Sequence, residues 1–133
     1  MSRRSRRMLG ALYAFRRARP TSRADGPGYL YAYIDNEHLF KIGMTKDFVR
    51  RKAEWDRRCP SSNRKWMPPI PVARRRRAES LAHLLLELWC TSRPRTYCLH
   101  CRKTHVEIFV FSSESSVAWE EIVYPLLIRA ARE

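Results

Sequence analysis

The chain has 133 residues, which is enough for one hydrophobic core but not for two independent ones, so we expect a single domain. It carries 27 lysines and arginines against 13 acidic residues, a formal charge of +14, and such a surplus predicts a polyanionic partner, most commonly nucleic acid. No apolar run approaches the roughly 20 residues of a membrane span, which excludes an integral membrane protein.

Most of the positive charge is arginine. The planar guanidinium binds phosphate through two parallel hydrogen bonds and stacks on bases, whereas the lysine ammonium acts as a point charge. This preference favours nucleic acid over a lipid surface. A GC-rich genome would raise the arginine content in the same way.

The first 24 residues contain eight arginines and no acidic residue. Three interpretations fit: a nuclear-import or DNA-contacting arm, an amphipathic mitochondrial presequence, or a disordered terminus. We therefore expect residues 1–25 to lie outside the fold and residues 26–133 to form the domain. The corresponding location is the nucleus or cytoplasm, or the mitochondrion if the segment is a presequence.

A tyrosine-bearing hairpin follows the breaker residues 25–28. Residues 29–34 alternate aromatic and aliphatic side chains at the period of a strand, which places their three tyrosines on one face. After a polar turn, residues 39–43 predict a second strand, and the two should pair as an antiparallel hairpin.

A helix is expected over 48–58, capped by Thr45 or Asp47. Its Phe48, Arg51, Lys52 and Trp55 are spaced three and four apart and form one mixed apolar and cationic stripe.

The remaining segments complete an α/β (α+β) pattern. Prolines restrict residues 65–72 to an edge strand or an extended loop. Residues 74–77 form a basic block that leads into a helix over 78–89; a last strand over 106–111 and a helix over 117–132, kinked at Pro125, follow. We expect three layers, with a central antiparallel sheet flanked by helices.

The order Tyr31, then Lys41-Ile42-Gly43-Met44-Thr45, Arg51 and Glu79 resembles the GIY-YIG endonuclease superfamily over residues 28–112. The further pattern of Glu79 with His83, then Glu107 with Phe109, resembles its phage-derived branch, the bacteriophage Orf172-type DNA-binding domain that is also found in fungi. Two positions depart from the nucleases: Lys41 replaces a tyrosine, and Trp55 stands where many carry a histidine.

The resemblance implies a catalytic set of Tyr31, Lys41, Arg51 and Glu79. Glu79 would hold Mg²⁺ or Mn²⁺, Tyr31 would activate or orient the nucleophile, and Arg51 would stabilise charge on the phosphate, with Lys41 binding phosphate. Because of the Lys41 substitution, we expect DNA binding without turnover first and a metal-dependent nuclease second. A basic, non-catalytic interaction adaptor is the third possibility.

Nucleic acid is expected to contact the basic surface around the tyrosine face with weak sequence preference and strong salt dependence. Trp55 or Trp66 would either stack on an unpaired base or belong to the core. The contact residues we expect are Gly43, Thr45, Arg50, Lys52, Arg57, Arg58, Arg74, Arg75, Arg76, His83 and Glu107.

Cysteine and histidine cluster near the end of the chain. Cys98 and Cys101 form a Cys-x2-Cys pair, and Cys90 and His105 flank it, so these four side chains predict a structural Zn²⁺ site. Alternatively, the cysteines are reduced, Cys90 lies in the core, and His105 joins Glu107 at a phosphate site.

Overall fold

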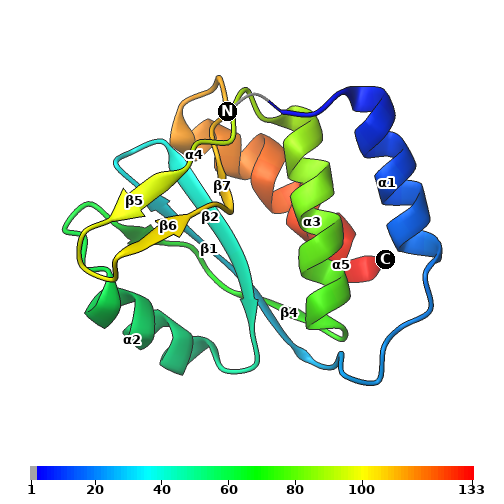
Figure 1. Cartoon of the computed structure of the whole chain (residues 1–133), viewed down its shortest axis with the longest axis horizontal. Helices are drawn as coiled ribbons and strands as arrows, with labels where there is room; N and C mark the ends of the chain where they lie inside the picture. The colour runs from blue at the N-terminus through cyan, green and yellow to red at the C-terminus, as the bar shows by residue number, and fades with distance from the viewer. Residues whose placement is uncertain (1–2) are drawn as a thin grey trace.

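The computed structural model describes residues 3–133 and contains a five-stranded antiparallel sheet in the order β3-β1-β2-β7, with β4 also paired to β1 (Figure 1). The strands are β1 (Gly28–Asp35), β2 (Leu39–Thr45), β3 (Lys65–Trp66), β4 (Ile70–Val72) and β7 (Ile108–Phe109). The predicted β1–β2 hairpin is confirmed. Its register places Tyr31 opposite Gly43 and Tyr33 opposite Lys41.

Helices cover both faces of this sheet, with α2 on one side and α3 and α5 on the other, and α1 packs on the outside of α3 (Figure 1). The helices are α1 (Arg6–Ala18), α2 (Phe48–Arg58), α3 (Arg75–Trp89), α4 (Ser115–Ala118), a π-helical turn (Trp119–Val123) and α5 (Tyr124–Arg132). The expected three-layer α/β fold is therefore confirmed. None of the helices in residues 3–133 is long and apolar enough to cross a membrane.

The alternation along β1 separates two apolar clusters. Leu30 and Ala32 face the main core under α3, together with Ile42 of β2. Tyr31 and Tyr33 face the opposite way and pack with Trp55 of α2. Because successive side chains of a strand point to opposite faces, one strand joins the structural core to the face that carries the tyrosines.

Several predicted boundaries match the structure. The helix expected over 48–58 is α2, and α3 begins inside the basic block. Residues 65–72 form two short edge strands that pair with β1, as their prolines allow. The helix expected over 117–132 is interrupted by a π-helical turn, Trp119–Val123, which ends two residues before Pro125, a residue with no N–H to donate to a regular turn.

A second hairpin was not predicted from the sequence. Strands β5 (Thr96–Cys98) and β6 (Lys103–His105) form a separate two-stranded sheet between α3 and β7, in the region of the cysteine and histidine cluster. Its strands are short and largely polar, so they lack the apolar alternation by which strands are recognised. Figure 1 shows this hairpin over β2, with its turn beside the end of α2.

Residues 3–25 belong to the fold, contrary to our expectation for residues 1–25, of which residues 1–2 lie outside the described part of the chain. Helix α1 packs against α3, with Leu9 fully buried and Tyr13 only 9% exposed. Leu9, Leu12 and Tyr13 are spaced three and four residues apart, so they share one helical face, while the arginines face solvent. The segment forms an amphipathic helix, and its high charge was the reason that we expected it to lie outside the fold.

An ion-pair network fixes this segment to α3. The carboxylate of Glu87 is 2% exposed and accepts hydrogen bonds from the Arg4 backbone and side chain, the shortest at 2.8 Å, and from Arg93 at 2.8 Å. Burial raises the pKa of Glu87, but the hydrogen bonds from Arg4 and the charge of Arg93 outweigh it and lower the pKa to about 2.

Replacing Glu87 with Gln should lower the free energy of unfolding at pH 7 by about 2–3 kcal/mol, because two arginines lose their counter-charge at a buried site. The folded-state pKa lies below the ordinary value near 4.5, so the wild-type advantage should be present above that pH and shrink as the pH falls toward 2. Urea unfolding at pH 7 and pH 3 measures both effects. Glu120→Gln, at an exposed position, is the control, and equal stability of wild type and Glu87→Gln at pH 7 would contradict the network's role.

Candidate nucleic-acid interface

A pocket of about 430 Å³ lies between the β1–β2 hairpin, α2, α3 and the segment around β6. All four residues of the expected catalytic set line it, and so does Glu107. These are Tyr31, Lys41, Arg51 and Glu79. The pocket is completed by Met44, Glu54, Trp55, Arg58, Cys59, Cys101, Lys103, Thr104, His105 and Val106.

Tyr31 is held rigidly at the base of this pocket. Its hydroxyl oxygen accepts hydrogen bonds from Trp55 Nε1 at 2.9 Å and from Arg51 Nε at 3.4 Å. A Cβ atom on Gly43 would lie 2.4 Å from the Tyr31 ring, so only glycine leaves room for it. Burial raises the pKa of Tyr31 despite the hydrogen bonds from Arg51 and Trp55, and the phenol is therefore neutral at neutral pH.

Lys41 lies opposite Tyr33 and reaches the same pocket. Its ammonium contacts Glu107 at 3.2 Å and lies 5.4 Å from the centroid of the Trp55 ring, while the Arg51 guanidinium lies 5.3 Å from that centroid. Burial lowers the pKa of Lys41, and the Glu107 carboxylate partly restores it. The Lys41–Glu107 pair thus puts a basic and an acidic group side by side in a shielded space.

Glu79, His83 and Glu107 form one group whose candidate ligand atoms all lie within 4.8 Å of one another, so these side chains could hold a metal ion. His83 Nε2 lies 2.9 Å from the carbonyl oxygen of Ile42, which leaves Nδ1 as the free ligand atom if Nε2 carries the proton. Burial and the charge of Glu107 raise the pKa of Glu79 to about 7. A bound cation would favour the charged form of this carboxylate.

A second group could also hold a metal ion. The ligand atoms of Cys59, Cys98, Cys101 and His105 all lie within 4.8 Å of one another. Cys90, which we expected among the ligands, does not belong to it: its buried thiol lies at the end of α3 and donates to the carbonyl of Glu87 at 3.4 Å. Cys59 takes its place, because the fold brings the end of α2 to the β5–β6 hairpin.

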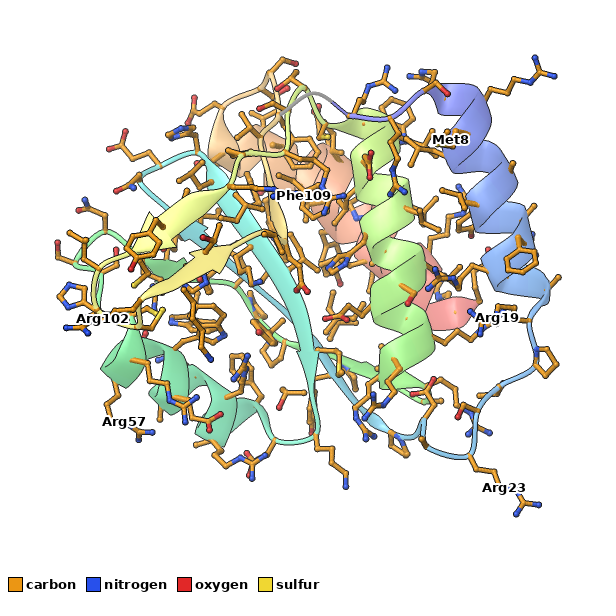
Figure 2. The ribbon with its side chains drawn as sticks, viewed as in Figure 1. Met8, Arg19, Arg23, Arg57, Arg102 and Phe109 are labelled. Atoms are coloured by element: carbon orange, nitrogen blue, oxygen red, sulfur yellow. The ribbon has the colours of Figure 1, made fainter. Side chains whose placement is uncertain are left out.

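The exposed cations of the interface gather where α2 meets this hairpin. Arg57, Arg58 and Lys103 line a shallow second depression beside the main pocket. In Figure 2, Arg57 and Arg102 both extend outward at this end of the molecule, opposite the end where Met8 and Arg19 lie. Two of the expected contact residues, Arg57 and Arg58, therefore lie with Lys103 at the rim of the main pocket.

Three further residues that we expected to contact nucleic acid lie on α2 or directly before it, and each makes contacts within the protein. Thr45 is buried and exchanges hydrogen bonds with the Asp47 backbone, which starts the helix. Lys52 pairs with Asp56 at 3.6 Å and lies 5.8 Å from the centroid of the Trp66 ring. Arg50 is exposed, and its backbone N–H donates to the capping carboxylate of Asp47.

The arginines before α3 do not line the main pocket within the described part of the chain. Arg75 is buried, and its side chain donates to Pro27 O at 3.2 Å. The backbone N–H groups of Arg76 and Arg77 donate to the two carboxylate oxygens of Asp25, and that of Arg75 donates to Gly26 O. This helix end is already satisfied, whereas an open helix N-terminus would favour a phosphate. The Arg75 side chain is used within the protein, and its expected nucleic-acid contact stays a prediction.

Cys59 and Lys103 line the pocket but were not among the residues predicted for the site from the sequence. No motif links Cys59 to the later cysteines, because the contact depends on tertiary structure. Lys103 lies in the hairpin that the sequence did not predict. The one signal in the sequence was the Cys59-Pro60 pair directly after the predicted helix, because a proline at a helix end fixes where the preceding cysteine lies.

The molecule is thus a small α/β domain with a cation-rimmed, acid-containing pocket on the tyrosine face of its sheet. The T5orf172 domain family matches residues 28–123, which span the sheet, α2, α3 and the second hairpin, so the chain belongs to this family. Membership indicates a DNA-binding or nuclease-like domain. The chain has no significant match among curated proteins or among solved structures.

Replacing Glu79 with Gln should stabilise the protein above pH 7. The folded-state pKa of about 7 lies above the ordinary value of 4.5, so the stability contributed by this carboxyl is full below pH 4.5 and is lost as the pH rises through 7. Discounting for partial exposure, we expect a gain on the order of 1–2 kcal/mol at pH 8 and little change at pH 4. Thermal unfolding at both pH values, with Glu120→Gln as control, measures this; a loss of stability at pH 8 would contradict it.

Proposed function

We propose that the protein binds DNA and that the phosphate backbone contacts the cations around the pocket that Tyr31 and Glu79 line. The observation that carries this proposal is the gathering of cations at one pocket in a member of the T5orf172 family. The cations are Lys41, Arg51, Arg58 and Lys103.

The cations differ in how free they are to meet a phosphate. Lys41 is buried against Glu107, and Arg51 pairs with Glu54 at 3.5 Å. Arg58 has a side chain that is 58% exposed and pairs with Glu54 only at 4.0 Å, and Lys103 is exposed. Arg58 and Lys103 would therefore make the first contacts, because their charged groups are already at the surface, where a phosphate can reach them.

The aromatic residues support backbone contact more than base stacking. Trp55 is only 8% exposed, and the cations of Lys41 and Arg51 lie against its ring. Trp66 packs on Tyr33, with ring centroids 4.9 Å apart. Trp55 is buried, and the half-buried Trp66 packs against Tyr31, Tyr33 and Phe48, so we propose little base stacking by either ring and expect weak sequence preference.

Replacing Arg58 and Lys103 together with Gln should weaken binding to duplex DNA by about tenfold or more at 0.1 M salt. It should also reduce the slope of log affinity against log salt by about two, one for each lost phosphate contact. Fluorescence anisotropy over a salt series measures both quantities, and single-stranded DNA and RNA competitors test the choice of nucleic acid.

The matched control is Arg23→Gln with Arg132→Gln, which removes the same charge at exposed positions away from the pocket; Figure 2 shows Arg23 extending from the far loop. Equal weakening by both double variants would mean that net charge drives binding. That result would sink the proposed interface.

A second function, divalent-metal-dependent DNA cleavage by a GIY-YIG-type site, is favoured by the Glu79, His83 and Glu107 group. Mg²⁺ or Mn²⁺ bound there would polarise a phosphate oxygen and neutralise developing charge. Arg51 would add positive charge, and Tyr31, fixed by its hydrogen bonds, would orient the attacking group. The Lys41 ammonium competes with a metal ion for Glu107, and for this reason we place binding before cleavage.

If cleavage occurs, Tyr31→Phe and Glu79→Gln should each reduce it by roughly 100-fold or more, because each removes a group that this mechanism requires. The controls are Tyr29→Phe on the same strand and Glu120→Gln on a distant helix. The assay incubates the full chain with branched, nicked and linear DNA, in Mg²⁺, Mn²⁺ or EDTA. Cleavage that survives both site changes comes from a contaminant or from another site.

A further inference from the structure

We propose that Cys59, Cys98, Cys101 and His105 bind one Zn²⁺ ion, which fastens the β5–β6 hairpin to the C-terminal end of α2. The proposal concerns the architecture of the pocket and does not require that the protein bind DNA.

The spacing of the ligand atoms fits a tetrahedral ion. His105 Nε2 lies 3.5 Å from the sulfur of Cys59 and 3.5 Å from that of Cys101. With Zn–S near 2.3 Å and Zn–N near 2.05 Å, two ligands of a tetrahedral site stand roughly 3.6 Å apart for a sulfur and a nitrogen. All four ligand atoms lie within 4.8 Å of one another, so small side-chain rotations would close the set around an ion.

The backbone of the hairpin turn presents its two cysteines together. Cys98 ends β5 and Cys101 lies in the turn, where the Arg102 N–H donates to Cys98 O at 2.8 Å. Arg102 adopts a left-handed conformation with φ of 57°, which reverses the chain directly after Cys101. A reversal that a non-glycine residue adopts at an energetic cost indicates that the surroundings determine this turn.

The remaining ligands come from rigid positions. Cys59 is the C-terminal cap of α2, with its N–H bonded to Trp55 O and its carbonyl bonded to the buried guanidinium of Arg64 at 2.6 Å. His105 ends β6, and its ring lies against that of Trp55 at a centroid distance of 5.1 Å. Four protein ligands leave no open position, which is typical of a structural site.

The hairpin needs such a link because it buries little apolar surface. Tyr97 is 61% exposed, Leu99 81% and Val106 45%. Without the hydrophobic contribution that holds other elements, a two-stranded hairpin is at most marginally stable in water. A metal ion supplies the missing free energy, and soft thiolate ligands with one imidazole select zinc over Mg²⁺ or Ca²⁺.

The link has a consequence for the pocket. Lys103, Thr104 and His105 form one of its walls, and all three belong to β6. Fastening Cys101 and His105 to α2 keeps this wall opposite Arg51 and Arg58. Zinc would therefore determine the shape of the pocket without touching anything bound in it.

Elemental analysis of the full chain, purified without chelator, should give about one equivalent of zinc. Cys59→Ser should lower the zinc content at least tenfold after dialysis, whereas Cys90→Ser, the same change in a buried cysteine outside the group, should retain one equivalent. Wild type that neither contains zinc nor takes it up on titration, or that holds a Cys98–Cys101 disulfide in place of metal, overturns the proposal. Equal zinc in Cys59→Ser overturns the assignment of Cys59.

Limited proteolysis gives a second readout that does not depend on how Cys59→Ser folds. Trypsin should cut the wild type after Arg102 or Lys103 at least tenfold faster when zinc is removed by chelation, and added Zn²⁺ should restore protection. The Cys90→Ser variant should behave as wild type. If chelation leaves the rate of cleavage in this turn unchanged, as it should leave the rate at other sites, zinc does not fasten the hairpin.

Discussion

The pocket depends on the packing of the Tyr31 ring over Gly43 in the neighbouring strand. The missing side chain at position 43 lets the ring lie down on the sheet, and Trp55 and Arg51 then reach its hydroxyl from α2. This one contact sets how closely α2 approaches the sheet, and it places the Arg51 guanidinium at the pocket. A side chain at position 43 would push the Tyr31 ring away from the sheet. It would thereby move α2 and the Arg51 guanidinium away from β2.

Around this contact the protein accumulates groups that do not favour folding. Glu79, Lys41 and Glu107 share a partly shielded space, and burial shifts the pKa of both Glu79 and Lys41 toward the neutral form. Such shifts concentrate at functional sites because chemistry requires charges where packing would exclude them. The opposite face of the sheet carries the main apolar core, where Leu81, Leu85 and Phe109 are nearly fully buried, and this core supplies the stability that the pocket lacks.

Local patterns predicted the fold well where the side chains themselves determine the structure. Alternation predicted β1, and the segment after the polar turn predicted its partner β2. Capping and side-chain spacing predicted α2 and α3, so the residues carried by these four elements could be expected to converge. The contacts that the sequence did not predict join residues that are far apart in the chain. Cys59 meets His105, and Asp25 caps α3, only after the chain has folded. Arg75 appeared to be a surface cation, but in the structure it packs against Gly28. The arginines of α1 led to three interpretations of the segment, all outside the fold, and none of them placed its apolar face against α3.

The cap that Asp25 and Gly26 form on α3 has a further consequence for the kinetics of binding. Because the first N–H groups of this helix are already bound within the protein, a phosphate gains nothing there from preorganised backbone donors. In the proposed interface the contacts would come instead from long arginine and lysine side chains, each of which loses rotamer entropy when it is held in place. An interface assembled from several such contacts forms quickly through charge attraction and releases its partner quickly, one side chain at a time. Rapid exchange between binding positions is the kinetic behaviour that the proposed interface implies.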